Sequence, residues 1–162
     1  MKQQLDRRQL LGAIALGSIA LIAQGAPVFA KGGQFRVSHS PAEWKKILGP
    51  KRYSILREAG TEIPYTSPLN KEHRKGLYSC AACDQKLYSS ATKFDSHTGW
   101  PSFWKPLPGG VVNRTDSTFG MARTEVLCAR CGGHLGHVFN DGPKPTGLRY
   151  CMNGLAMKFA VA

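Results

Sequence analysis

Two Cys-x-x-Cys pairs are the strongest chemical signal in this sequence. Cys80 and Cys83 form the first pair, and Cys128 and Cys131 form the second. Each pair can present two thiolates from one tight turn, and two such turns facing each other complete the four-sulfur tetrahedral site that zinc prefers. We therefore expect a zinc ion on these four cysteines. Iron at the same site and two disulfides are the alternatives, the latter because disulfides persist in oxidising compartments.

The expected metal site is structural, because four protein thiolates leave no open position for catalysis. The stretch between the pairs is longer than the linker of a compact zinc finger. We therefore expect the pairs to lie at the turns of two hairpins that bracket a sheet. Gly132 and Gly133 follow the second pair and supply the flexible backbone of such a turn.

Cys151 is the one cysteine left over from the two pairs. An odd cysteine in an exported protein is a free reactive thiol or an intermolecular partner. Arg149 precedes it by two residues, and a nearby guanidinium favours the nucleophilic thiolate. The alternative is a buried, inert cysteine in a strand.

Four further stretches occur in a fixed order around these cysteines. They are residues 99–103 (Gly-Trp-Pro-Ser-Phe), 134–139 (His-Leu-Gly-His-Val-Phe), 141–143 (Asp-Gly-Pro) and 147–153 (Gly-Leu-Arg-Tyr-Cys-Met-Asn). Together with the cysteine pairs, they resemble the B-type methionine-R-sulfoxide reductases from about residue 43 to residue 159. Enzymes of this class reduce one epimer of methionine sulfoxide.

The resemblance implies a mainly β fold of two antiparallel sheets, with short N-terminal helices and a zinc ion on the two cysteine pairs. It also implies that the Cys151 thiolate attacks the sulfoxide sulfur of free or protein-bound methionine-R-sulfoxide and is left as a sulfenic acid. His134, His137 and Asn153 match the family's positions around the substrate.

A sulfoxide oxygen is a poor leaving group until it is protonated, so the reaction needs an acid whose pKa lies near the working pH. We expect His137 to be this proton donor and His134 to assist it. Arg149 would stabilise charge that develops on the sulfoxide oxygen. Two structural histidines, or one that replaces a cysteine at the metal, are the alternatives.

Two aromatic residues are expected to bind the substrate. Trp100 would give the S-methyl group a flat apolar wall, since sulfur is attracted to aromatic rings. Phe139 lies at the end of the His-Leu-Gly-His-Val-Phe stretch and is the second such residue. A tryptophan beside a proline more often packs in a core, which is the alternative for Trp100.

The sequence departs from the family pattern at two positions. Many members carry a second, resolving cysteine just before the Gly-Trp-Pro-Ser-Phe stretch, where this chain has Thr98. A sulfenic acid on Cys151 would then need an external reductant, either a thioredoxin-like protein or a small thiol. Gly154 replaces the family's usual serine, which affects only the expected local packing.

Short helices and strands must position these residues. Ser40, Pro41 and Glu43 predict a helix start with a capping box, and Trp44, Ile47 and Leu48 give that helix an apolar face. Gly49-Pro50 ends it, and a second helix over residues 51–59 is closed by Gly60. The runs 76–79, 111–112, 121–127 and 158–161 lie between turn signals and predict strands.

The N-terminus predicts export. Arg7-Arg8 precedes an apolar run, and Val28-Phe29-Ala30 is a cleavage site, so residues 1–30 read as a twin-arginine-type signal peptide. Residues 31–40 would then be a flexible tether and residues 41–162 the catalytic domain. We expect a periplasmic protein without stable membrane insertion after cleavage. An uncleaved anchor is the alternative, although the apolar run is shorter than the ~20 residues that span a bilayer.

Composition narrows the function classes. A chain of 162 residues with 42 % hydrophobic residues fits one globular domain with appendages. Its formal net charge of +12 would by itself allow nucleic-acid binding, but an exported protein seldom meets nucleic acid, so we expect no such partner. The rivals to an enzyme are a zinc-ribbon interaction module in which Cys151 merely packs, and an inactive relative that binds proteins.

Overall fold

The computed structural model describes residues 35–117 and 122–162. The expected signal peptide, the first part of the expected tether and the start of the strand expected at 121–127 lie outside the described residues. Residues 35–40 of the tether contact the domain: Val37 N–H donates to Arg130 O over 3.0 Å, and the Phe35 ring fills the space where a side chain at Gly132 would lie. Within the described residues, no helix has the length and apolarity needed to cross a membrane.

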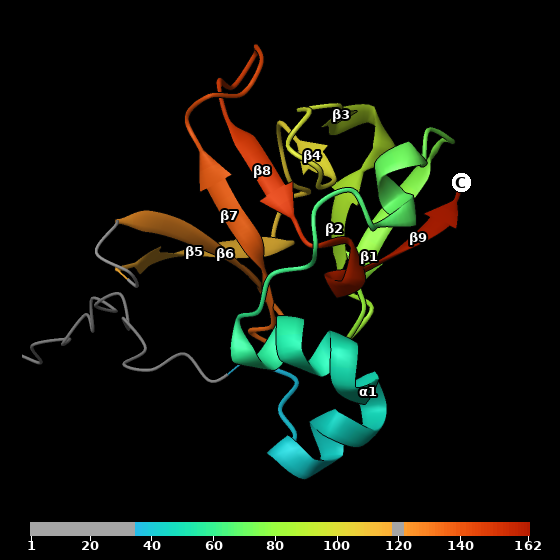
Figure 1. The fold of residues 1–162 in the computed structure, drawn as a ribbon, viewed down its shortest axis with the longest axis vertical. Helices are drawn as coiled ribbons and strands as arrows, with labels where there is room; N and C mark the ends of the chain where they lie inside the picture. Colours follow the sequence, from blue (N-terminus) through green and yellow to red (C-terminus); the bar gives the residue numbers. More distant parts are fainter. Residues whose placement is uncertain (1–34, 118–121) are drawn as a thin grey trace, which may run out of the picture. The chain divides into compact units, whose positions relative to one another are not determined.

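Two antiparallel sheets dominate the described part of the chain (Figure 1), which confirms the expected fold class. The smaller sheet has the strand order β2-β1-β9, and the larger has the order β3-β4-β8-β7-β6-β5. The strands are β1 (Gly76–Cys80), β2 (Lys86–Ser89), β3 (Lys93–Phe94), β4 (Ser102–Phe103), β5 (Val111–Asp116), β6 (Arg123–Cys128), β7 (His134–Phe139), β8 (Arg149–Met152) and β9 (Met157–Val161). Among the described residues, the 3₁₀ turns are η1 (Pro68–Lys71), which precedes β1, η2 (Ser90–Thr92), between β2 and β3, and η4 (Gly154–Ala156), between β8 and β9.

Helix α1 (Pro41–Glu58) begins as the sequence predicts. Ser40 Oγ accepts from the Glu43 N–H, and the Glu43 carboxylate accepts from the Ser40 N–H over 2.8 Å, which is the expected capping box. Gly49 has φ 67° and ψ 170°, a non-helical conformation that kinks the helix just before Pro50. The two helices expected from the sequence are therefore the two arms of one kinked helix.

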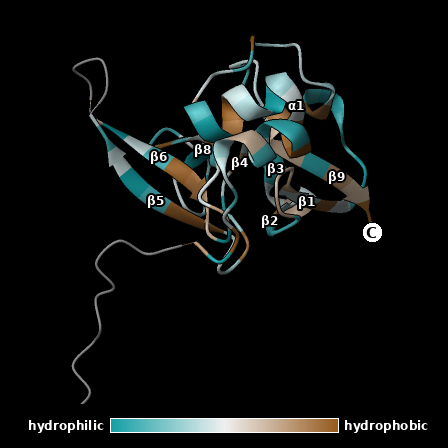
Figure 2. Ribbon diagram, turned by 90° about the horizontal axis from the view of Figure 1, so that it is seen from below, coloured by the Kyte–Doolittle hydropathy of each residue, from teal (hydrophilic) through white to brown (hydrophobic). Residues whose placement is uncertain are grey.

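The buried face of α1 is narrower than the sequence predicted. Trp44 and Leu48 are buried, but Ile47 is 53 % exposed, so its placement on the buried face was wrong. The helix packs on β7 and η4, and Figure 2 shows hydrophilic and hydrophobic residues alternating along it. Successive residues of a helix are about 100° apart around its axis, so Ile47 can face solvent while Leu48 is buried.

Aromatic rings fill the space between the two sheets. Tyr88 of β2 stacks on Phe103 of β4 with ring centroids 4.3 Å apart, and Tyr78 of β1 packs edge-on against the same Phe103 at 4.9 Å. Strand β8 adds Tyr150 and Met152 to this core. Because side chains alternate along a strand, Cys151 points to the opposite face of β8, away from the core.

Candidate functional site

Both cysteine pairs lie at the turns of hairpins, as expected. Cys80 ends β1, and Cys83 lies in the turn that leads to β2; Cys128 and Cys131 occupy the same positions between β6 and β7. In the second turn, the Gly132 N–H donates to Cys128 O over 2.9 Å, and Gly132 has φ 67°. The two hairpins belong to different sheets, so the cysteines join the sheets rather than bracket one of them.

The four sulfur atoms have the spacing of a metal site. They all lie within 4.8 Å of one another, with Cys80 Sγ 3.8 Å from Cys131 Sγ and Cys83 Sγ 3.5 Å from Cys128 Sγ. Four thiolates at about 2.3 Å from one tetrahedral ion would lie about 3.8 Å apart. All four cysteines are free, and these spacings exceed the ~2.05 Å of a disulfide bond. The donor set therefore fits a four-coordinate, thiolate-preferring ion such as zinc.

A cleft of about 170 Å³ opens on the face of the larger sheet that carries Cys151. Strand register places His137 of β7 directly opposite Cys151 of β8. Gly136 lies beside them, where a Cβ would overlap the Cys151 carbonyl, so a larger residue would push the two strands apart. The cleft is lined by Thr61, Trp100, Arg123, His134, Gly136, His137, Phe139, Cys151 and Asn153. It thus brings together six of the seven expected catalytic and substrate-binding residues.

The two histidines each contact a carboxylate of the same sheet: Glu125 lies on β6, beside β7, and Asp116 lies on β5, one strand further. His137 Nε2 lies 3.0 Å from Asp116 Oδ2, and His134 Nδ1 lies 2.7 Å from Glu125 Oε1. Burial lowers the pKa of His134 and outweighs the opposing effect of Glu125. The His134 side chain is only 5 % exposed and that of His137 is 17 % exposed. His137 is therefore the better placed of the two to exchange a proton with a molecule in the cleft.

Arg149 is the expected site residue that does not line the cleft. Its guanidinium donates two hydrogen bonds of 2.8 Å to the Asp141 carboxylate and lies over the Phe139 ring, 4.4 Å from its centroid. Burial raises the pKa of Cys151, and hydrogen bonding by Thr98 and the charge of Arg149 only partly oppose this effect. Arg149 thus favours the thiolate, as expected, but burial has the larger effect.

Asn153 and Trp100 are held in place by one residue that sequence reasoning missed. Asn153 Oδ1 accepts from the Glu62 N–H over 2.8 Å, and Trp100 Nε1 donates to Glu62 O over 2.9 Å. The Asn153 amide also donates to Leu135 O over 3.2 Å. Both ends of the Asn153 side chain are therefore bonded to backbone, which indicates a positioning role.

Comparison with known proteins agrees with this geometry. Residues 48–161 match the model of the SelR domain. The chain is 56 % identical over 126 residues to the peptide methionine sulfoxide reductase MsrB of Leptospira interrogans, covering 77 % of this chain and 96 % of that protein. It is 58 % identical over 125 residues to the protein of the same name from Agrobacterium fabrum, covering 76 % and 93 % of the two chains. The chain belongs to the B-type methionine-R-sulfoxide reductase family.

The structure shows what surrounds the two positions at which this chain departs from the pattern of the reductase family. Thr98 Oγ1 lies 3.7 Å from Cys151 Sγ, so the position of the expected but missing second cysteine adjoins Cys151. A Cβ at Gly154 would overlap Ser67 Oγ, so glycine is the residue that fits beside Ser67.

Besides Glu62, sequence reasoning missed the charged residues around the two histidines, which are Asp116, Arg123 and Glu125. They lie on β5 and β6, outside the recognised motifs, and reach the histidines only because β6 pairs with β7. The alternation of residues along β6 places Arg123 and Glu125 on one face, which is the signal that could have identified them.

Proposed function

We propose that this chain reduces methionine-R-sulfoxide, free or in proteins, to methionine through the thiol of Cys151. The observation that carries the proposal is the pairing of Cys151 with His137 across adjacent strands, in a cleft that Trp100 also lines. A nucleophile and a proton donor thus face the same space.

In the first step, the Cys151 sulfur attacks the sulfoxide sulfur, and the oxygen passes to the cysteine. The sulfoxide gains two electrons and leaves as methionine, and the thiol loses two electrons and becomes a sulfenic acid. His137 donates a proton to the sulfoxide oxygen, which weakens its bond to the methionine sulfur and becomes the hydroxyl proton of the sulfenic acid, and Asp116 orients the imidazole. Trp100 packs against the S-methyl group.

In the second step, two external thiols reduce the sulfenic acid. The first displaces its oxygen as water and forms a mixed disulfide with Cys151, and the second releases Cys151 as a thiol. A thioredoxin-like protein or a small thiol is the proposed reductant, because Thr98 occupies the position next to Cys151 where many family members carry a thiol.

The proposed cofactor is one zinc ion on Cys80, Cys83, Cys128 and Cys131. When bound, zinc contributes structure rather than chemistry, since the four thiolates fill its tetrahedral shell. These cysteines come from hairpins of both sheets, so the ion would fix the position of β7 relative to β1. His137 lies on β7 and would be positioned with it.

Export to the periplasm by a twin-arginine route, with cleavage after Ala30, stays a prediction. The paired Arg7-Arg8 and the apolar run that follows support it. N-terminal sequencing of the protein from a periplasmic fraction should find Lys31 first. Retention in the membrane with residues 1–30 intact would indicate an anchor instead.

The enzyme proposal is tested with zinc-loaded protein, chirally resolved methionine sulfoxide and dithiothreitol. We expect consumption of the R epimer at sulfur and persistence of the S epimer. The Cys151→Ser variant is the matched control, because serine is a far weaker nucleophile at neutral pH. If the wild-type protein leaves both epimers unchanged, the chain acts as a zinc-ribbon interaction module or an inactive relative instead.

A further inference from the structure

A chain of three hydroxyl groups ends at the sulfur of Cys151. Thr98 Oγ1 lies 3.7 Å from Cys151 Sγ, Ser96 Oγ lies 2.9 Å from Thr98 Oγ1, and Ser102 Oγ lies 2.7 Å from Ser96 Oγ. Ser102 is fully buried and pairs with Cys151 across β4 and β8. Its hydroxyl is also within 3.3 Å of Trp100 O, a carbonyl that can only accept.

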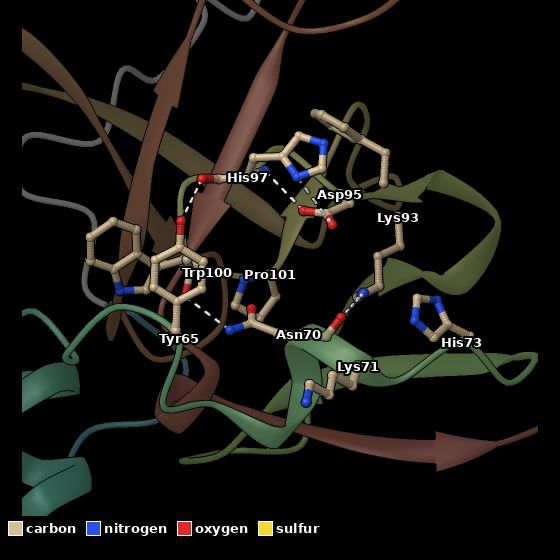
Figure 3. A pocket seen from close by; sticks show the side chains of 11 residues that line it. Tyr65, Asn70, Lys71, His73, Lys93, Asp95, His97, Trp100 and Pro101 are labelled. Carbon is tan, nitrogen blue, oxygen red and sulfur yellow. Dashed lines mark hydrogen bonds and ion pairs between the residues drawn. The ribbon is translucent and has the colours of Figure 1, made fainter.

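The segment that carries Thr98 is clamped on both sides. Tyr65 OH donates to His97 O over 2.7 Å, and Asn70 Nδ2 donates to Gly99 O over 2.9 Å, as Figure 3 shows. His97 and Gly99 both have left-handed φ values, 57° and 95°, so the chain turns sharply before and after Thr98. The Thr98 hydroxyl therefore has a fixed backbone from which to reach the sulfur.

We propose that the Thr98, Ser96 and Ser102 hydroxyls form a hydrogen-bond chain that reverses direction when Cys151 ionises and so stabilises the thiolate. Each hydroxyl has one hydrogen and can both donate and accept. With a thiol at Cys151, the S–H donates to Thr98, Thr98 to Ser96, Ser96 to Ser102, and Ser102 to Trp100 O.

With a thiolate, each hydroxyl proton rotates the other way. Ser102 then donates to Ser96, Ser96 to Thr98, and Thr98 to the sulfur, and the thiol proton has left through the cleft. A hydrogen bond to an ionised group is stronger than one between neutral groups, so the chain favours ionisation. Burial raises the pKa of Cys151, and the hydrogen bond from Thr98 is the largest of the opposing effects.

The other charged groups that face Cys151 come from neighbouring strands. Arg149 lies on its own strand, His137 lies opposite on β7, and His134 and Arg123 line the same cleft. Ser102 and Arg149 also lower the pKa of Cys151 through hydrogen bonds of their own. A change at Thr98 leaves all of these groups in place, so substitutions there isolate the contribution of the Thr98 hydroxyl.

The test measures the pH dependence of Cys151 alkylation by iodoacetamide in the zinc-loaded protein, with the Cys151 peptide quantified by mass spectrometry. Thr98→Val keeps the shape of the side chain and removes the hydroxyl. We expect its alkylation rate at pH 7 to fall about tenfold, because a hydrogen bond to a charged group is lost. Thr98→Ser restores the hydroxyl and should stay within about twofold of wild type.

Ser96→Ala breaks the chain one step further away and should give a smaller loss, about threefold. A Thr98→Val protein that titrates like wild type would overturn the proposal, as would a Thr98→Ser protein that loses as much reactivity as Thr98→Val. This inference rests on the proposed nucleophile, but the alkylation assay needs no sulfoxide. If the alkylation rates change as expected but the protein reduces no sulfoxide, the hydroxyl chain is supported and the proposed function is wrong.

Discussion

His137 Nε2 lies 3.0 Å from Asp116 Oδ2, and Arg123 donates to the same carboxylate oxygen over 2.9 Å. The carboxylate thereby orients the imidazole toward the cleft and is itself oriented by Arg123. This arrangement gives His137 a fixed position opposite Cys151.

Replacement of His137 by alanine should lower kcat/KM for methionine-R-sulfoxide by about 10²-fold or more, because the sulfoxide oxygen loses its proton donor. Asp116→Asn should give a smaller loss, since the imidazole stays and only its orientation is weakened. Steady-state kinetics with the resolved epimer measures both. An unchanged rate in His137→Ala would mean that His134 or water donates the proton instead.

Metal analysis should find about one zinc per chain, bound by four sulfur atoms. Removal of zinc with a chelator, or the Cys80→Ser change, should unfold the domain, since structural zinc contributes ~10 to 16 kcal/mol of apparent binding free energy to folding. Circular dichroism and thermal melts measure the loss. Cys151→Ser is the control and should keep both zinc and fold. A metal-free protein with an unchanged Tm would contradict the structural role.

One turnover without reductant should leave a sulfenic acid on Cys151 and no intramolecular disulfide, because the other four cysteines cluster together as the metal site. A sulfenic-acid reagent followed by peptide mapping detects it. A disulfide from Cys151 to one of the four, with release of zinc, would show instead that the metal site takes part in the redox cycle.

The matched variant for that experiment is Thr98→Cys. Since Thr98 Oγ1 is 3.7 Å from Cys151 Sγ, a cysteine there should condense with the sulfenic acid and form a disulfide between residues 98 and 151. Non-reducing peptide mapping after one turnover identifies the bond. Persistence of the sulfenic acid in this variant would mean that the clamped segment keeps the two sulfurs apart.

Stability should fall as the pH drops below about 6.5, partly because of His134. Burial lowers the pKa of His134 in the folded state, so the unfolded state binds a proton first. The contribution is complete above the unfolded pKa and is lost as the pH falls from about 6.5 toward the folded pKa. His134→Gln should flatten this part of the Tm profile. Parallel profiles for wild type and His134→Gln would refute the assignment.

Residue types and their spacing were enough to predict the candidate site and the mainly β fold. The two Cys-x-x-Cys pairs, the leftover Cys151 and the motifs around it are local patterns, and the spacing of such residues limits what they can bind or attack. The helix start at Ser40 and Glu43 was also predictable, since a capping box forms between residues three positions apart.

The contacts between distant segments could not be predicted from the sequence and are known only from the fold. The pairing of β6 with β7 brings Glu125 to His134, and β5 brings Asp116 to His137; strand register is set by the whole core and not by the residues themselves. The direction in which the pKa of Cys151 is shifted could not be predicted from the sequence either, because burial depends on every element packed around the cleft. Nor could the sequence show that Thr98 touches Cys151, since 53 residues separate them along the chain and only the pairing of β4 with β8 brings their segments together.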